Sequence, residues 1–220
     1  MTTFPNSPRL LKGGIVLIDP DTSAVIRVVA LQYNPDTVTR TLQVQAFAAG
    51  DTGDRSEALR IKAPPVETIK VDAEIDATDQ LEFPDRHPDA GKLGILPQLA
   101  ALETIVYPSS RQLLANNTLA QMGTLEIVPM QAPLTLFVWS AQRILPVRLT
   151  DFSVTEDGFD PALNPIRAKV SLGLRVLSVH DLGFEHKGGS LFMSYLQAKE
   201  LLAARGPGGS FSTLGITGIR

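Results

Sequence analysis

The segment 133–177 constrains the fold most, because it contains three strand-like runs separated by two turns. Both alternating faces of 134–139 are apolar, which is typical of an interior strand covered on its two sides. After the polar turn 140–143, the alternation runs through Leu149 and slips by one residue before Phe152, which predicts a β-bulge. In the third run, 168–176, apolar residues alternate with polar residues or glycine. This pattern predicts an antiparallel strand with one buried face, formed by Ala168, Val170, Leu172, Leu174 and Val176. We therefore predict an antiparallel meander with Val138 and Leu172 in its core.

Other β-type segments precede this meander. The apolar runs 15–18 and 25–31 flank the Pro- and Asp-containing turn 19–23, which indicates a hairpin. Asn34 and Pro35 end its second strand in a sharp corner, because proline offers no N–H to a ladder. Alternation over 69–77 predicts a strand with one wet face, carrying Asp72, Glu74 and Asp76, and 124–128 predicts another strand.

Two helices are predicted from periods of three and four residues. In 93–106 the apolar residues share one face, and Tyr107-Pro108 ends the helix; they are Ile95, Leu99, Leu102 and Val106. The second helix starts at Ser190 as N-cap and ends before Gly206-Pro207, with Leu191, Tyr195, Ala198 and Leu202 on one face. Segment 47–60 is expected to be a mobile loop, 81–91 a polar connection, and 112–123 stays undecided. The chain is thus predicted to be mainly β (α+β), with one domain over 1–205 and a flexible Gly-rich tail over 206–220.

Composition narrows the function classes. The 220 residues are 44% hydrophobic and carry a net charge of −3, with lysines and arginines scattered along the chain. Nucleic-acid binding needs a concentrated basic surface, so we expect no nucleic-acid partner. No apolar run reaches the roughly 18 residues of a membrane span, so we expect no membrane insertion. We recognise no signal peptide, and the chain has no cysteine, so we expect a cytoplasmic protein.

The sequence offers little catalytic chemistry. His87, His180 and His186 have no metal-ligand spacing, and we interpret them as isolated loop or surface histidines. The acidic residues on 72–76 are interpreted as the polar side of a strand, because they alternate with apolar residues. The nucleophile elbow and the phosphate-binding loop are not found. We predict no catalytic, cofactor-binding or metal-binding residue, and no enzyme activity.

Several segments together resemble one known family. The run FVW…RILPVRLTDFSVTEDGFDPALNPIRAKVSLGLRVL resembles the tube-adaptor proteins of contractile injection systems, the phage-tail-like machines that drive a tube through a target envelope. LQYNPDTVTR (31–40), APPVETIKVDAEID (63–76) and LGILPQLAALETIVYP (93–108) are similar to its aromatic-Asn-Pro signature, central strand and helix. These segments span most of the chain. Longer family members add a LysM module after the terminal helix, and here only a Gly-rich segment follows.

This resemblance implies a fold and a function. The expected fold is an antiparallel β-barrel or sandwich of the phage tail-tube type, with a packed helix and a C-terminal helix. The expected assembly is a homo-hexameric ring that joins the tube protein to the spike protein and baseplate subunits. Candidate contacts between subunits or with those partners lie at the Asn-Pro corner, in the 47–60 loop and in the 160–165 turn. They are Asn34, Pro35, Asp51, Asp54, Arg55, Asp160, Pro161, Asn164 and Pro165.

Some alternatives stay open at this point. Trp139 is either a core residue or an anchor between subunits, and the 160–165 turn is either a rigid connection or a contact. A monomeric β-sandwich, acting as a ligand-binding module or a hydrolase, is the alternative function. The segments 15–18 and 124–128 are apolar and almost uncharged, and we interpret them as unprotected sheet edges, which a closed ring would pair.

Overall fold

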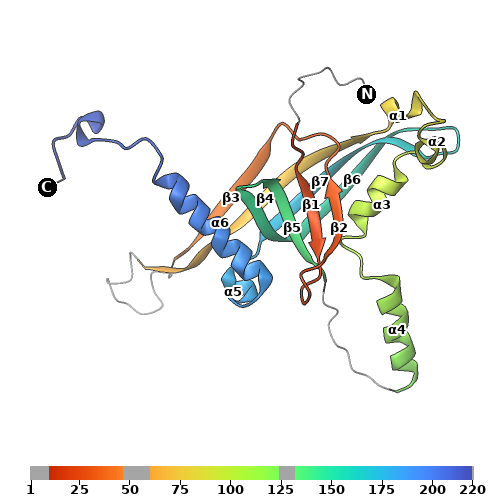
Figure 1. The fold of residues 1–220 in the computed structure, drawn as a ribbon, viewed down its shortest axis with the longest axis horizontal. Coiled ribbons are helices and arrows are strands. Elements are labelled where there is room, and N and C mark those ends of the chain that lie inside the picture. Colours follow the sequence, from red (N-terminus) through yellow and green to blue (C-terminus); the bar gives the residue numbers. More distant parts are fainter. Residues whose placement is uncertain (1–9, 47–59, 124–131, 220) are drawn as a thin grey trace.

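The computed structural model describes residues 10–46, 60–123 and 132–219. Its strands form one seven-stranded antiparallel sheet in the order β2-β1-β5-β6-β7-β4-β3, accompanied by several helices (Figure 1). The mainly β, α+β class predicted from the sequence is confirmed. The strands are β1 (Gly14–Ile18), β2 (Val25–Ala30), β3 (Val38–Ala46), β4 (Ile61–Asp76), β5 (Leu134–Ser140), β6 (Arg143–Phe159) and β7 (Pro165–Val176).

The predicted meander is the interior of the sheet. β5, β6 and β7 are consecutive neighbours, and the pairing of β6 with β7 shifts between Leu149 and Asp151, where the alternation slips. Gly173 lies opposite this bulge. A Cβ at Gly173 would lie 2.6 Å from Oδ2 of Asp151, so glycine provides the space for the extra residue. The bulge prediction is confirmed.

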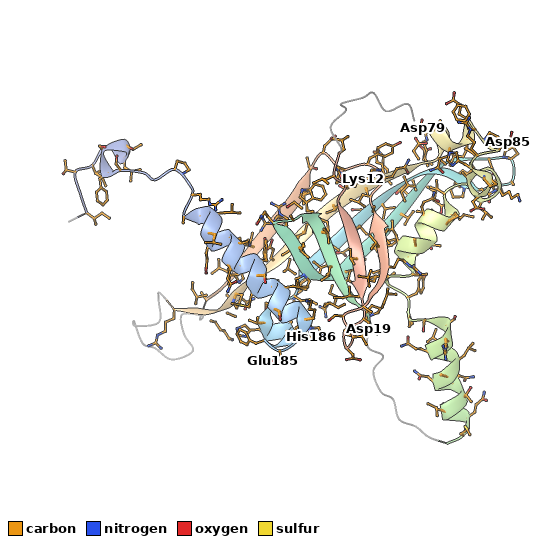
Figure 2. All side chains as sticks on the ribbon, in the orientation of Figure 1. Lys12, Asp19, Asp79, Asp85, Glu185 and His186 are labelled. Carbon is orange, nitrogen blue, oxygen red and sulfur yellow. The ribbon has the colours of Figure 1, made fainter. Side chains whose placement is uncertain are left out.

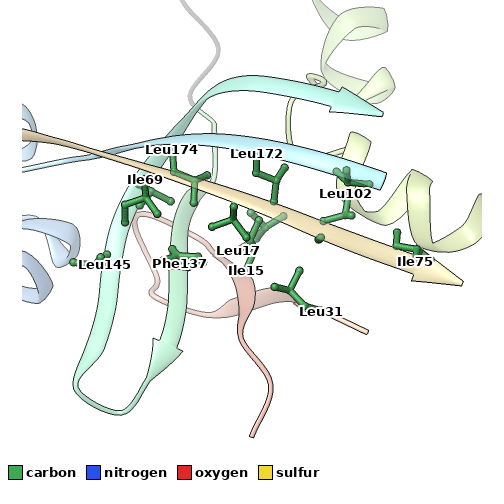
Figure 3. Packing of buried hydrophobic residues seen from close by; sticks show 14 of the residues in the cluster. Ile15, Leu17, Leu31, Ile69, Ile75, Leu102, Phe137, Leu145, Leu172 and Leu174 are labelled. Carbon is green, nitrogen blue, oxygen red and sulfur yellow. The ribbon is translucent and has the colours of Figure 1, made fainter. Parts of the chain in front are cut away.

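The long strand β6 joins two parts of the sheet that face each other. Its first five residues, 143–147, pair with β5, and 147–159 pair with β7. The core lies between β1 and β5 on one side and β4 and β7 on the other (Figure 3), with Phe137, Ile69 and Leu174 at most 1% exposed. The buried side of β7 predicted from its alternation is confirmed, including Leu172 at 2% exposure.

One prediction about the sheet edges was wrong, and one strand was missed. β1 is not an edge, because it lies between β2 and β5. The edges are β2 and β3, and β3 was not predicted, although Val38, Leu42 and Val44 occupy alternating positions in it. The predicted strand 124–128 and the predicted loop up to residue 59 lie outside the described residues.

The apolar outer face of β5 is covered by the last two helices. Leu134 and Leu136 form a second cluster with Ile18, against which Leu182 and Leu191 pack. This cover explains why both faces of β5 are apolar. This cover stops short of Val138, so Val138 is half-buried. The prediction that Val138 is buried in the core was wrong. Trp139 packs at the margin of the main core and stacks on Phe137 with ring centroids 5.8 Å apart.

Helices α3 (Leu96–Glu103) and α6 (Lys187–Ala203) close the core at its two ends (Figure 1). The helix predicted over 93–106 is shorter at both ends. Ile95 is the N-cap of α3, Leu99 and Leu102 lie within the helix, and all three are buried, but α3 ends at Glu103 and leaves Val106 46% exposed. α6 begins one turn before the predicted start. His186, and not Ser190, is its N-cap. Its buried residues are Gly188, Gly189, Phe192 and Tyr195, whereas the predicted face residue Leu202 is exposed.

Further helices occupy segments for which no helix was predicted, among them the undecided segment 112–123. They are α1 (Thr78–Leu81), α2 (Pro88–Leu93), α4 (Ser110–Gln121), α5 (Val179–Leu182) and the 3-10 turn η2 (Phe211–Leu214). Pro88 sits in the first turn of α2, where its missing N–H costs nothing. Ser210 caps η2 by accepting a hydrogen bond from the Thr213 N–H, so the 206–220 tail holds a local turn. Within the described ranges, each helix falls short of the length and apolar content of a membrane span.

Candidate assembly surfaces

The outward face of the long strands is polar and exposed. Register places Asp72 beside Ser171, and Ser171 beside Ser153, in one row across β4, β7 and β6. The next row holds Glu74, Lys169 and Thr155. All of these side chains are exposed, and most are small. The opposite face of the same strands forms the core, so this sheet has one dry and one wet face.

Charges on this polar face are balanced. Lys169 Nζ lies 3.6 Å from Oε1 of Glu74, and a guanidinium nitrogen of Arg167 lies 3.3 Å from Oδ2 of Asp157. Exposed ion pairs of this kind contribute little stability, but they keep the field of the surface small. Basic side chains equal acidic ones in number across the face: Lys70, Arg148, Arg167, Lys169 and Arg175 against Asp72, Glu74, Asp76, Asp151 and Asp157.

Both edge strands expose apolar side chains. On β2, Ile26 is 53% and Val28 63% exposed, and on β3, Val44 is 68% exposed. An edge strand with apolar side chains is a template for pairing with another chain.

β3 and the start of β4 extend past the sheet as a two-stranded ribbon. β4 pairs with β7 only from Thr68 onward, whereas its pairing with β3 continues to Ile61. The prolines at 64 and 65 fall in this ribbon, where β4 has a partner on one side. Ile61 is 73% exposed. A two-stranded ribbon is marginally stable alone, so further pairing would stabilise this one.

The hairpin tip between β6 and β7 contains four of the predicted contact residues. Oδ1 of Asp160 accepts hydrogen bonds from the N–H groups of Ala162 and Asn164, both at 2.8 Å, and Oδ2 accepts one from Nδ2 of Asn164 at 2.8 Å. The side-chain and backbone hydrogen bonds of Asn164, with that of Ala162, lower the pKa of Asp160. Leu163 adopts a φ of +65° and is 79% exposed. Pro161, between these partners, is exposed as well.

The tip is also tied to the helical end of the core. Nδ2 of Asn164 donates to the Lys92 carbonyl at 3.0 Å, and the Ile95 N–H donates to the Pro165 carbonyl at 2.9 Å. The structure therefore shows a rigid connection here. Its role as a contact between subunits stays a prediction.

At the predicted corner, Asn34 links two chain segments. Its Oδ1 accepts from the Gly13 N–H at 2.9 Å, and its Nδ2 donates to the Leu11 carbonyl at 2.7 Å. These bonds hold the segment before β1 against the end of β2, with Pro35 next to them half-buried. The other predicted contacts, Asp51, Asp54 and Arg55, lie outside the described residues.

The histidines lie at separate places. His87 and His180 are exposed, and His186 accepts a hydrogen bond of 3.0 Å from the Gly188 N–H through Nδ1 as the cap of α6. Figure 2 shows His186 beside Glu185, at the end of the molecule where Asp19 forms the β1–β2 turn. No cluster of potential metal ligands forms among the side chains in the described part of the chain.

One polar cluster inside the molecule was not predicted from the sequence. Glu67 is 4% exposed and accepts hydrogen bonds from Nε of Arg40 at 2.7 Å, the Tyr195 hydroxyl at 3.2 Å and Nζ of Lys199 at 3.2 Å. Burial disfavours the Arg40 charge, while the hydrogen bond and charge of Glu67 favour it; the net effect raises the pKa of Arg40. The sequence carried one signal for this cluster. Glu67 lies two residues before Ile69 in β4, so the two side chains share the buried face of the strand.

This cluster attaches α6 to the β3–β4 edge. Arg40 is on β3, Glu67 on β4, and Tyr195 and Lys199 on α6. A buried carboxylate with several charged donors fixes one geometry. We interpret the cluster as a structural anchor that holds the edge strand in place.

A scan against protein-family models finds no match to this chain, and a search of curated proteins finds none either.

Proposed function

We propose that this protein is a structural subunit that assembles head to tail into a hexameric ring, of the kind that joins the tube of a contractile injection system to its spike and baseplate. The proposal takes its function from the resemblance of the sequence to tube-adaptor proteins. The observation in the structure that supports it best is the open sheet with an apolar edge strand at each end, β2 and β3. Two different edges on one subunit suit a heterologous contact, which closes into a ring when the rotation allows it.

The polar face of β4, β6 and β7 suits the lining of a lumen. In this arrangement the rows of small and charge-paired side chains would face the central channel, and the helices on the core side would face outward. A balanced surface retains water and gives a passing object no strong charge to bind. The phage tail-tube type of fold is part of the same proposal.

Paired cysteines test the edge contact, because the chain has no cysteine of its own. Val28→Cys on β2 and Val44→Cys on β3 would be made in separate copies with different affinity tags and then mixed. The proposal predicts a disulfide between the two tags under mild oxidation, together with ring-sized particles in sedimentation. A pair on the polar face of two interior strands, Ser153→Cys on β6 with Asp72→Cys on β4, is the control and should not link copies. A monomer at every concentration, with no linked product, would exclude the proposal.

A further inference from the structure

Helix α4 (Ser110–Gln121) stands apart from the rest of the molecule. Figure 1 shows it extending away from the sheet below α3. None of its residues is buried, and Leu114 is 68% exposed. The Ser109 side chain accepts a hydrogen bond from the Gln112 N–H at 3.2 Å, so the helix has a defined start.

A helix of this length needs a partner. Isolated helices shorter than about 12 to 15 residues are marginal in water, and α4 has 12. α4 contains a single charged residue, Arg111, so it has no internal ion pairs of the type that stabilise a solvated helix. The stability of α4 therefore points to a contact surface outside the helix.

One face of α4 combines its charge with its most exposed apolar side chains. Arg111, Leu114, Thr118 and Met122 follow at intervals of three and four residues, which places them along one side of the helix. Leu114 and Met122 are 68% and 74% exposed, compared with 49% for Leu113 and 48% for Leu119 on other sides. We call these four residues the Arg111 face.

The body of the protein carries a groove with matching properties. It has a volume of about 490 Å³ and lies between the end of α3 and the middle of β6. Leu149, Phe152 and Val154 form its apolar floor, and each is a half-buried residue that packs on the main core. Two acidic residues line it: Glu103 at the end of α3, and Asp151, whose carboxylate lies over Gly173 on the polar face of the sheet. The core is thus incompletely covered here, beside a negative rim.

We propose that the Arg111 face of α4 from one copy docks into this groove of a neighbouring copy. Leu114 and Met122 would cover the apolar floor, and Arg111 would pair with Glu103. The occupant is a second copy, because α4 extends away from α3 and the sheet of its own chain (Figure 1), whereas the groove lies between α3 and β6. The inference rests on the proposed head-to-tail assembly and names a second contact within it.

Charge reversal with rescue is the test. One tagged copy carries Leu114→Cys and the other Val154→Cys, and the yield of disulfide between tags measures docking. Adding Arg111→Glu to the first copy should lower this yield about fivefold, the factor for an ion pair worth about 1 kcal/mol. Adding Glu103→Arg to the second copy should restore it. Arg205→Glu, a reversal at an exposed residue outside α4, is the matched control and should leave the yield unchanged.

The outcomes separate this inference from the proposed function. If the β2–β3 disulfide forms and the α4–groove disulfide does not, the assembly stands and the docking is wrong. If Leu114→Cys and Val154→Cys in one chain link within a diluted monomer, α4 fills its own groove and the docking between copies is wrong. If neither disulfide links copies, the proposed assembly fails and the inference fails with it. Linkage between tags that responds to both reversals supports the docking.

Discussion

Glu67 of β4 and Lys199 of α6 are joined by an ion pair of 3.2 Å, although they are 132 positions apart in sequence. Lys199 Nζ also lies 4.1 Å from the centroid of the Tyr195 ring, and that hydroxyl donates to the same carboxylate. One buried acid therefore fixes the helix that covers this end of the core.

Replacing Glu67 with Gln should destabilise the protein. The amide removes the negative charge that compensates Arg40 and Lys199, and charged hydrogen bonds of this kind are worth about 1.5 to 3 kcal/mol each. Chemical denaturation should show a decrease of that size in the free energy of unfolding. Glu74→Gln is the matched control, because the Glu74–Lys169 pair is exposed and should change stability by less than about 1 kcal/mol. Equal effects of the two substitutions would contradict the anchoring role of Glu67.

Aspartate substitutions should separate the core from its margin. Leu172 is 2% exposed, so Leu172→Asp would bury an unpaired charge and should cost more than about 4 kcal/mol, enough to prevent folding. Val138 is half-buried, and Val138→Asp should leave a folded protein with a lower melting temperature. Thermal melts with circular dichroism distinguish the two. A folded Leu172→Asp variant would show that the core is assigned wrongly.

Gly94 should not tolerate a side chain. Its φ is +56°, and a Cβ would lie 2.2 Å from the carbonyl oxygen of Pro165. Gly94→Ala should therefore lower the free energy of unfolding by about 1 to 3 kcal/mol. Gly91→Ala in α2 is the control, since its Cβ would meet Pro84 at 3.6 Å and a helical alanine should add about 0.5 to 1 kcal/mol. Denaturant titration of both variants checks this, and a neutral Gly94→Ala would contradict the tight packing of the tip.

The Asp160 turn should weaken in acid. Hydrogen bonds from the Asn164 side chain and backbone lower the pKa of Asp160, so the folded state holds this proton more weakly than the unfolded chain. Its contribution to stability is then complete above the ordinary pKa of Asp and is lost as the pH falls through the lowered value. Carboxyl NMR titration should place the midpoint below the ordinary value. In Asn164→Ala the midpoint should rise; an unchanged midpoint would show that Asn164 is not the cause.

Alternation in the sequence was enough to predict the meander, its bulge and the buried face of β7. These features depend on a pattern of period two, which one buried and one wet face impose directly. The edge strand β3 and the ribbon at the start of β4 were missed, because their side chains are mostly exposed and no core selects them. The position of β1 inside the sheet depends on pairing between distant segments, which local patterns do not encode.

The surfaces were harder to predict than the core. The alternation in β4 places Glu67 on the buried face of the strand. Its partners on β3 and α6 come from distant parts of the chain, so the sequence did not indicate them. The Asn34 and Asp160 side chains were correctly placed at turns, and their hydrogen bonds became visible only in the structure. Alternation predicted which residues of each strand lie on the outward polar face. The charge balance across β4, β6 and β7 became visible only from the register in which the strands pair.

The position of the polar sheet face in an assembled particle tests the account most directly. Ser171→Cys lies in the middle of that face and can carry a small gold label, since the chain has no other cysteine. Electron microscopy of the labelled protein, assembled with the proposed tube and spike partners, would locate the gold relative to the ring. The account predicts hexameric rings with gold inside the central channel. Gold on the outer rim, or particles without ring symmetry, would contradict it.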